Sequence, residues 1–275
     1  MMREPEPFQQ IVGRGILPVR GKMILGGHPK ANKSWVAMNM AFDIAEGLPL
    51  FAAQYSNGTP VFPVTKPCKV LYIEQELGDI GTKDRMRGLL EARGLDPEGL
   101  QLWLKTKDMA MRVDTPEGRV AIAKEIDSVR PDVTFLDPMA KFHLSDENSA
   151  QHMGAVMRVG DRWIQDYGTA LVWVHHVGKE SAEHPRRGGD RLRGSSAIFA
   201  DTDTFVEVKN RSGVTNREPV LELDFELRRG EPLEPVFVKR HRNGSIEYMG
   251  EGYKFGTGAR RSYGHAEPTT PYSDL

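Results

Sequence analysis

The chain has 275 residues, 39% of them hydrophobic, so it is long enough to form one large domain around a buried core. Its 37 Lys and Arg residues against 38 Asp and Glu residues give a net charge of -1, which excludes a globally basic chain and leaves nucleic-acid binding to local clusters. A single cysteine, Cys68, excludes an internal disulfide and argues against a zinc site. Because we find no secretory pattern and no long uncharged run, we expect a cytoplasmic protein without a membrane partner.

The first elements predicted along the chain are a strand and a helix. Residues 1–20 carry prolines and charges without periodicity, and we interpret them as an N-terminal lead-in segment. The stretch "GKMIL" then predicts a short buried strand. Apolar residues at Trp35, Met38, Phe42 and Ala45 have helical spacing, so we predict an amphipathic helix over 34–46 that ends before "GLP".

The same alternation of strands and helices continues to residue 176. Predicted strands are "KVLYIEQE", "LQLWL", "VTFLD" and "ALVWVHH", and predicted helices cover 81–93, 116–129 and 151–167. Nearly continuous apolar strands that alternate with amphipathic helices are typical of a parallel sheet covered on both faces. We therefore predict an α/β fold.

After Ala200 the pattern changes to closely spaced strands. "TFVEV", "VLELDFEL" and "VFVKRH" are separated by turn signals, which predicts antiparallel hairpins that extend the sheet. The polar stretch 255–275 is expected to be a flexible tail. The predicted domain division is thus a lead-in at 1–20, a main α/β domain at 21–254 and a tail at 255–275.

The segment "GGHPKANKS" lies between the first strand and the first helix and resembles a phosphate-binding loop, G-x-x-x-x-G-K-[ST]. Gly27, Lys33 and Ser34 fit this pattern, whereas Asn32 replaces a glycine. Asn is one of the few other residues that adopt left-handed backbone conformations, so the replacement is tolerable. Lys33 is expected to neutralise the β- and γ-phosphates of ATP, and Ser34 to bind Mg²⁺. The alternative is a helix start with an incidental lysine.

Acidic residues end two of the predicted strands. Asp137 follows "VTFL", where an aspartate can hold the metal's water shell; the alternative is a turn aspartate before Pro138. Glu74 and Glu76 end "VLYIEQE" on the same side of an extended segment. One of them can position the attacking water, and we favour Glu76. The alternative for this pair is a solvated strand end.

Two further sets of residues follow the strand "ALVWVHH". His175 and His176 point to opposite faces of a strand, which argues against a shared metal; one of them can contact a phosphate, and the alternative is a buried histidine with satisfied hydrogen bonds. The loop after them is basic and glycine-rich and can grip the phosphates of single-stranded DNA, or it is only a solvated loop. Its candidate residues are Lys179, Arg186, Arg187, Arg191 and Arg193.

Taken together, "GGHPKANKS", "VLYIEQELG", "VTFLDPMAKFHLSDENSA", "ALVWVHHVGK" and "RLRGSSAIFADTD" resemble, in order and approximate spacing, the AAA_25 group of RecA-like P-loop ATPases related to plasmid RepA replicative helicases. The resemblance covers roughly residues 15–245. It implies a RecA-like core, a hexameric ring with ATP between neighbouring subunits, and single-stranded DNA in the central channel.

The resemblance also implies roles for individual residues. Glu76 is similar in position to the catalytic base, Asp137 to the metal-side aspartate and His176 to the γ-phosphate sensor. Arg193 resembles the arginine finger that reaches the neighbour's nucleotide, and Arg85 aligns with a further phosphate-contacting arginine. Arg228 and Arg229, in "FELRRGEP", stand where we place the family's Lys-x-Asn/Arg-x-Gly element, as candidates for a second finger. The expected nucleotide-contacting loop consists of Gly27, His28, Pro29, Lys30, Ala31, Asn32, Lys33, Ser34 and Trp35.

Three functions remain open from the sequence. The first is an ATP-driven replicative helicase or translocase of a plasmid, phage or integrated element, with a primase or loader supplied as a separate partner. The second is a RecA-like ATP- and DNA-binding recombination, repair or regulatory protein that does not unwind DNA. The third is a degenerate phosphate loop retained for assembly, which residues such as Glu76 and Arg193 argue against because a scaffold needs neither a base nor a finger.

Overall fold

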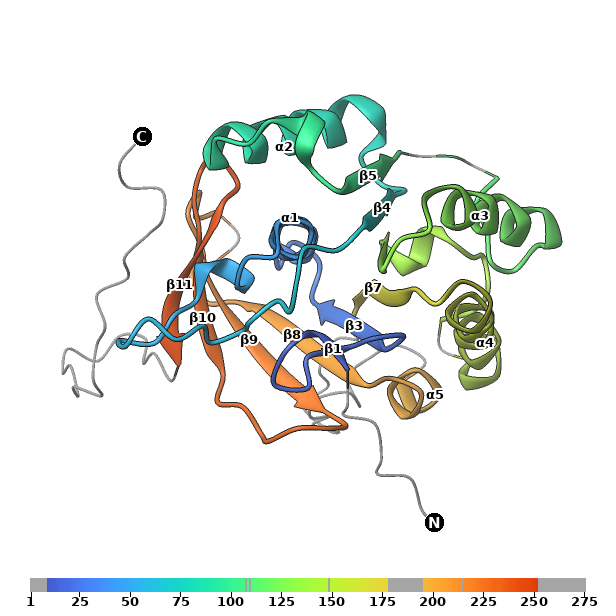
Figure 1. The fold of residues 1–275 in the computed structure, drawn as a ribbon. Helices are drawn as coiled ribbons and strands as arrows, with labels where there is room; N and C mark the ends of the chain where they lie inside the picture. The colour runs from blue at the N-terminus through green and yellow to red at the C-terminus, as the bar shows by residue number, and fades with distance from the viewer. Residues whose placement is uncertain are drawn as a thin grey trace, which may run out of the picture.

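The computed structural model describes residues 9–177 and 195–251, except 107, 109, 148 and 214 and the side chains of 195–197. In these residues a nine-stranded sheet runs through the molecule, with helices on both faces (Figure 1). Its strand order is β11-β10-β9-β8-β3-β7-β6-β4-β5. The segments 1–8, 178–194 and 252–275 lie outside the description.

The strands of the large sheet are β3 (Lys22–Gly27), β4 (Val70–Glu74), β5 (Leu102–Lys105), β6 (Val133–Asp137), β7 (Ala170–His176), β8 (Thr204–Asn210), β9 (Val220–Leu227), β10 (Val236–Arg240) and β11 (Ile246–Glu251). Strands β3 to β8 are parallel wherever they pair, and β8, β9, β10 and β11 pair antiparallel in turn. The predicted α/β fold, with a mostly parallel sheet and C-terminal antiparallel strands, is confirmed.

Helices cover the two faces of the sheet unequally. They are α1 (Lys33–Glu46), α2 (Gly78–Arg93), α3 (Pro116–Val129), α4 (Ala150–Tyr167) and α5 (Ser195–Ala200), with 3₁₀ turns η1 (Leu50–Ala52), η2 (Pro97–Gly99) and η3 (Met139–Lys141). Residues of α1 and α2 belong to one apolar core, and residues of α3, α4 and α5 belong to a second core on the opposite face. Figure 1 shows α2 lying across α1 and reaching the end of the β10–β11 hairpin. No helix in the described ranges has both the length and the apolar character needed to cross a membrane.

Most predicted elements agree with the structure to within a few residues. The predicted bounds of α3, β6, β7 and β9 are those observed, whereas α2 begins at Gly78, three residues earlier than expected. The sequence analysis missed β1 (Gln10–Val12), β2 (Leu17–Pro18), β11 and α5. The first two pair with each other, with one further bridge from Val12 to Val64, and are too short to show a period, yet Ile11, Val12, Ile16 and Leu17 are buried in the core. The segment 1–20, interpreted as a lead-in, therefore contains two short paired strands.

Helix α1 is buried on nearly all sides, which differs from the amphipathic helix expected from the sequence. Met38, Phe42 and Ala45 lie in the core as predicted, but the polar Asn39 and Asp43 are buried as well. Buried polar groups require hydrogen-bond partners, so the elements around α1 must supply them.

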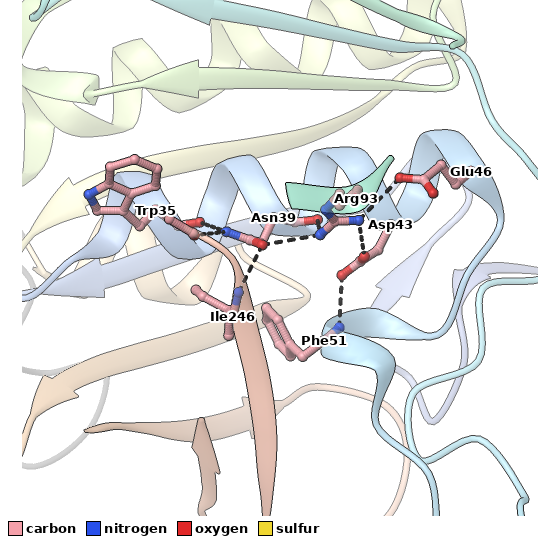
Figure 2. Close-up of polar contacts among 8 residues, drawn as sticks. Trp35, Asn39, Asp43, Glu46, Phe51, Arg93 and Ile246 are labelled. Carbon is pink, nitrogen blue, oxygen red and sulfur yellow. Dashed lines mark hydrogen bonds and ion pairs between the residues drawn. The ribbon is translucent and has the colours of Figure 1, made fainter. Parts of the chain in front are cut away.

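Arg93, at the end of α2, supplies most of these partners (Figure 2). Its Nη1 lies 2.7 Å from Asp43 Oδ1 and 3.1 Å from Glu46 Oε1, and its Nη2 donates to Asn39 Oδ1 at 3.1 Å. Burial raises the pKa of Asp43 and of Glu46, although the Arg93 charge opposes both shifts. The ion pairs with Arg93 therefore keep the carboxylates of Asp43 and Glu46 charged in an environment whose burial disfavours the charged forms.

The same network reaches the C-terminal hairpin and the loop after α1. Asn39 Nδ2 donates to Gly244 O at 3.0 Å, and Ile246 N donates to Asn39 Oδ1 at 3.2 Å. Phe51 N donates to Asp43 Oδ2 at 2.8 Å. One row of polar side chains thus fixes α1 to α2, to η1 and to β11.

We predict that Arg93→Met lowers the free energy of unfolding by about 3–5 kcal/mol at pH 8, because it leaves the buried Asp43 carboxylate without its partner. The loss becomes smaller toward pH 5, since the pKa of Asp43 is raised and its protonation removes the uncompensated charge. Equilibrium urea unfolding at the two pH values measures both effects.

Arg87→Met is the matched control on the same helix. Arg87 forms an exposed ion pair with Asp84, so its replacement is expected to change the stability by less than about 0.5 kcal/mol. Equal losses in the two variants would show that the buried network does not carry the stability assigned to it.

Candidate nucleotide-binding site

Several predicted site residues gather at one edge of the sheet, where the parallel strands end. Gly27 is in register with His176, and Glu74 with Asp137. Because β3, β7, β6 and β4 are neighbours, their carboxyl ends form one continuous edge, and ligands of parallel α/β sheets bind at such edges.

The loop between β3 and α1 adopts the backbone conformation that the sequence required. Asn32 has φ 71° and ψ 23°, in the left-handed region, and Lys30 also has a positive φ of 64°. The expectation that Asn32 takes the left-handed conformation of the missing glycine is confirmed. At the start of α1, the backbone N–H groups of Lys33, Ser34 and Trp35 donate no hydrogen bond within the described chain, so they are available to an anion.

Gly27 is needed because two other groups approach its backbone closely. A Cβ at this position would lie 2.5 Å from the carbonyl oxygen of Val208 and 3.3 Å from the side chain of Lys33. The first glycine of the loop therefore leaves room for the lysine to pass.

Lys33 is buried, and its ammonium group contacts the loop itself. Nζ donates to the carbonyl oxygen of His28 at 2.9 Å and lies 3.1 Å from Nδ1 of His176. Burial lowers the pKa of Lys33 to about 8, while Asp137 and then Glu76 act in the opposite direction. A dianionic phosphate would stabilise the charged form, so the site favours an anion beside Nζ.

Asp137 lies next to Ser34, as a metal site at this edge requires. Ser34 Oγ donates to Asp137 Oδ1 at 3.2 Å, and the hydroxyl of Tyr72 donates to Oδ2 at 2.6 Å. Burial raises the pKa of Asp137 to about 6, and the two hydrogen bonds oppose this rise. A carboxylate and a hydroxyl side by side are oxygen ligands of the kind Mg²⁺ takes, so these residues fit a magnesium ion bound with nucleotide.

The two glutamates after β4 differ in environment. Glu74 is buried, and its carboxylate accepts hydrogen bonds from the backbone N–H groups of Glu76 and Leu77 and from the hydroxyl of Thr82. Glu76 is exposed, and its charge raises the pKa of both Lys33 and Asp137. Glu74 thus stabilises the turn that leads into α2, whereas Glu76 is free to face a ligand near Lys33.

The two histidines at the end of β7 point to different environments, as expected from a strand. His175 is fully buried, while His176 is partly exposed and lies beside Lys33. A charged Lys33 can only donate, so Nδ1 of His176 is the acceptor in this contact.

Trp35 and Arg85 lie together beside the loop. The guanidinium of Arg85, on α2, lies 4.8 Å from the centroid of the Trp35 ring. Arg85 also lowers the pKa of Tyr72, against the larger effect of burial, which places its charge near the Asp137 hydrogen bond. A role for Arg85 in phosphate binding stays a prediction.

Arg228 and Arg229 follow β9 at the edge of the sheet opposite to the phosphate loop of their own chain, and their role as a second finger toward a neighbouring subunit stays a prediction. Strand β9 runs antiparallel to β8, so its last residue pairs with Thr204, at the amino end of β8. The Arg228 side chain donates to Ala200 O. Strand direction is the reason for this placement.

A better match to the Lys-x-Asn/Arg-x-Gly element lies elsewhere in the chain and was not recognised from the sequence. Lys209-Asn210-Arg211-Ser212-Gly213 fits Lys-x-Asn/Arg-x-Gly residue for residue, and it lies where β8 ends, at the same edge as the phosphate loop. Lys209 Nζ lies 2.9 Å from Asp224, and Arg211 forms two hydrogen bonds to Glu222. The pattern alone would have found this element.

The predicted DNA-binding residues and one predicted finger fall outside the described residues. They are Lys179, Arg186, Arg187, Arg191 and Arg193. Strand β7, the last strand described before them, ends at the edge that carries the phosphate loop.

Comparison with known protein families identifies the kind of domain that carries this site. The model of a family described as an AAA domain, AAA_25, matches residues 1–182, which is more than half of the chain. The matched range contains the phosphate loop, Glu76, Asp137 and His176. A search of curated proteins finds no match.

We predict that ADP binding takes up about half a proton per site near pH 8 and almost none below pH 7, because the phosphates return the lowered pKa of Lys33 toward its usual value. Isothermal titration calorimetry in Tris and in HEPES, which differ in ionisation enthalpy, measures the uptake. Lys33→Arg, which stays charged, should bind without it, and an uptake that persists in this variant would assign the proton elsewhere.

We also predict that Tyr72→Phe weakens the Mg²⁺-dependent part of nucleotide binding roughly tenfold, since a hydrogen bond to a charged group contributes about 1.5–3 kcal/mol. The ring stacks on Phe135 at 5.5 Å between centroids, and phenylalanine keeps that contact. Binding of a fluorescent ADP analogue, titrated with and without Mg²⁺, separates the two parts. The same loss without Mg²⁺, or in a Tyr248→Phe control, would contradict a specific effect on Asp137.

Proposed function

The chain belongs to the AAA_25 family of AAA domains, and from this premise we propose that it is a ring-forming ATPase motor that moves on single-stranded DNA. Membership supports nucleotide binding and ATPase activity. The observation that carries the proposal is the placement of Lys33, the Ser34–Asp137 pair and Glu76 around one phosphate loop. Together they provide a phosphate-binding cation, metal-binding oxygens and a base.

In the proposed reaction Lys33 neutralises charge on the β- and γ-phosphates, and the free N–H groups at the start of α1 bind phosphoryl oxygens. Ser34 and Asp137 would hold Mg²⁺, which supplies further charge neutralisation when it is bound. Glu76 orients the attacking water and accepts its proton. His176, beside Lys33, is positioned to respond to the terminal phosphate.

Glu76 is preferred to Glu74 for the base because of hydrogen bonding. The carboxylate of Glu74 already accepts three hydrogen bonds from its own turn, and losing them would disturb the start of α2. Glu76 is exposed at the same turn and can approach a bound ligand.

Two elements support action between subunits. Arg193 is proposed as an arginine finger on the basis of the family resemblance. Lys209 and Arg211 are proposed as the second pair in place of Arg228 and Arg229, because they fit the pattern and lie at the nucleotide edge. In the single chain both are held by Glu222 and Asp224, so reaching a neighbour's phosphates requires exchanging one anionic partner for another.

The DNA partner is proposed from the basic residues of 178–194 and from the resemblance to RepA-type replicative helicases. A hexameric ring, an origin in a plasmid, phage or other mobile element, and a separate primase or loader belong to the same proposal. The alternative is a RecA-like recombination, repair or regulatory protein that hydrolyses ATP on DNA without separating strands.

We predict that ATP turnover increases at least several-fold on addition of single-stranded oligonucleotide, and that light scattering of the same sample shows a species of ring mass. Lys33→Ala should abolish turnover because it removes the cation beside the phosphates. The folded state of each variant is checked by circular dichroism. A displaced-strand assay then separates the helicase from the alternative that does not unwind.

Glu74→Gln and Glu76→Gln form a matched pair for this experiment. The first should lower stability with smaller effects on turnover per folded molecule, and the second should reduce turnover by orders of magnitude without changing the melting temperature. Turnover that survives in Glu76→Gln, or that is unaffected by DNA in a well-folded protein, argues against the motor.

A further inference from the structure

Two arginines lie over one tryptophan beside the phosphate loop. The guanidinium carbons of Arg85 and Arg240 are 4.8 and 5.4 Å from the ring centroid of Trp35. Arg85 comes from α2, Arg240 ends β10, and Trp35 directly follows Ser34 in α1. Three elements far apart in sequence therefore meet at this ring. Figure 2 shows Trp35 at one end of the polar row of α1, with Glu46 at the other end.

Strand direction places this group at the nucleotide edge. Strand β8 is parallel to β3, β9 returns, and β10 runs in the direction of β3 again. Arg240, the last residue of β10, is consequently at the edge where β3 opens into the phosphate loop. Arg85 acts electrostatically on Tyr72, whose hydroxyl bonds to Asp137, so its charge lies toward the same side.

Neither guanidinium is neutralised within the described residues. No ion pair joins Arg85 or Arg240 to a carboxylate there, and Arg240 donates to the carbonyl oxygen of Arg217. The Nε of Arg240 is buried without a hydrogen-bond partner. Burial and then the nearby Arg85 charge lower the pKa of Arg240, whereas Glu218 acts in the opposite direction by a smaller amount.

We propose that Arg85 and Arg240, stacked on Trp35, form a phosphate-binding pair beside the phosphate loop. The ligand is a phosphoryl group whose oxygens accept hydrogen bonds from the guanidinium groups, from a nucleotide or from a nucleic-acid backbone. The indole holds the planar groups in place, and an anion offsets the repulsion between them. This site deepens the proposed function and rests on it for the identity of the nucleotide.

Packing alone accounts less well for the arrangement. One cation over the indole would connect α1 to α2, and a neutral side chain on β10 would fill the remaining space. A second positive charge on the same ring adds repulsion and leaves a buried N–H group without an acceptor. A phosphate bound at the guanidinium groups would offset the repulsion between the two charges.

Trp35 fluorescence tests the pair directly. The signal is the emission of the wild-type protein minus that of Trp35→Phe. This subtraction removes the contributions of the other three tryptophans. The full chain is titrated with Mg²⁺-ATP, with Mg²⁺-ADP and, without nucleotide, with a single-stranded oligothymidylate. We expect one of these ligands to change Trp35 emission. A response to ATP assigns the phosphate to a nucleotide, whereas a response to the oligonucleotide assigns it to a nucleic-acid backbone.

Arg240→Gln keeps a planar side chain without the charge and should weaken that ligand's affinity about tenfold. Arg240→Lys should retain most of the affinity, and Arg242→Gln, an exposed neighbour, should change it less than twofold. Arg85→Gln provides a second test if Arg240→Gln unfolds. Equal affinities in Arg240→Gln and Arg242→Gln, or no binding of any ligand by the wild-type protein, overturn the pair.

The two proposals fail in different ways. Binding that depends on Arg240 in a protein without ATP turnover refutes hydrolysis and leaves the phosphate-binding pair intact. DNA-stimulated turnover with binding that is independent of Arg240 refutes the pair and leaves the motor intact.

Discussion

The burial of α1 is the constraint on which the rest of the structure depends. A helix that begins at the phosphate loop and then passes through the core must satisfy Asn39 and Asp43 away from water. Arg93 does this from α2, and the backbone of the β10–β11 hairpin completes it. The direction of α1, and with it the orientation of Lys33 and Ser34, is therefore set by residues far from the phosphates. In this arrangement the hairpin supports the site as well as extending the sheet.

The site itself is electrostatically unfavourable without a ligand. Burial lowers the pKa of Lys33 to about 8 and raises that of Asp137 to about 6, so the charged form of each residue is less favoured in the fold than in water, although it still predominates near pH 7. Each of these changes corresponds to roughly 3 kcal/mol of differential stabilisation. Phosphates and a divalent cation would favour the charged forms, so their binding would offset the cost of burying these two charges. Nucleotide binding should accordingly stabilise the fold, and most strongly the edge formed by β3, β6 and β7.

Sequence alone predicted the parts of this molecule that have a local signal. The alternation of apolar strands with amphipathic helices gave the α/β fold and its parallel sheet, and the left-handed tendency of asparagine explained Asn32. The buried network could not be predicted, because Asp43 and Arg93 look like ordinary surface residues of two helices until the helices pack. Strands β1 and β2 were missed because two- and three-residue strands have no period. The different environments of Glu74 and Glu76 depend on the turn into α2 and became visible only in the structure.

Strand direction determines which basic residues lie at the edge that carries the phosphate loop. In the C-terminal part, successive strands end at alternate edges of the sheet, so β8 and β10 end beside the phosphate loop and β9 ends on the far side. Basic residues at the ends of β8 and β10 lie at the edge that carries the phosphate loop, whereas Arg228 and Arg229 lie at the opposite edge. The same rule selects Lys209, Arg211 and Arg240 from many arginines and lysines of similar sequence context. For a mixed sheet of this kind, the edge at which a strand ends is as informative as the sequence motif that follows the strand.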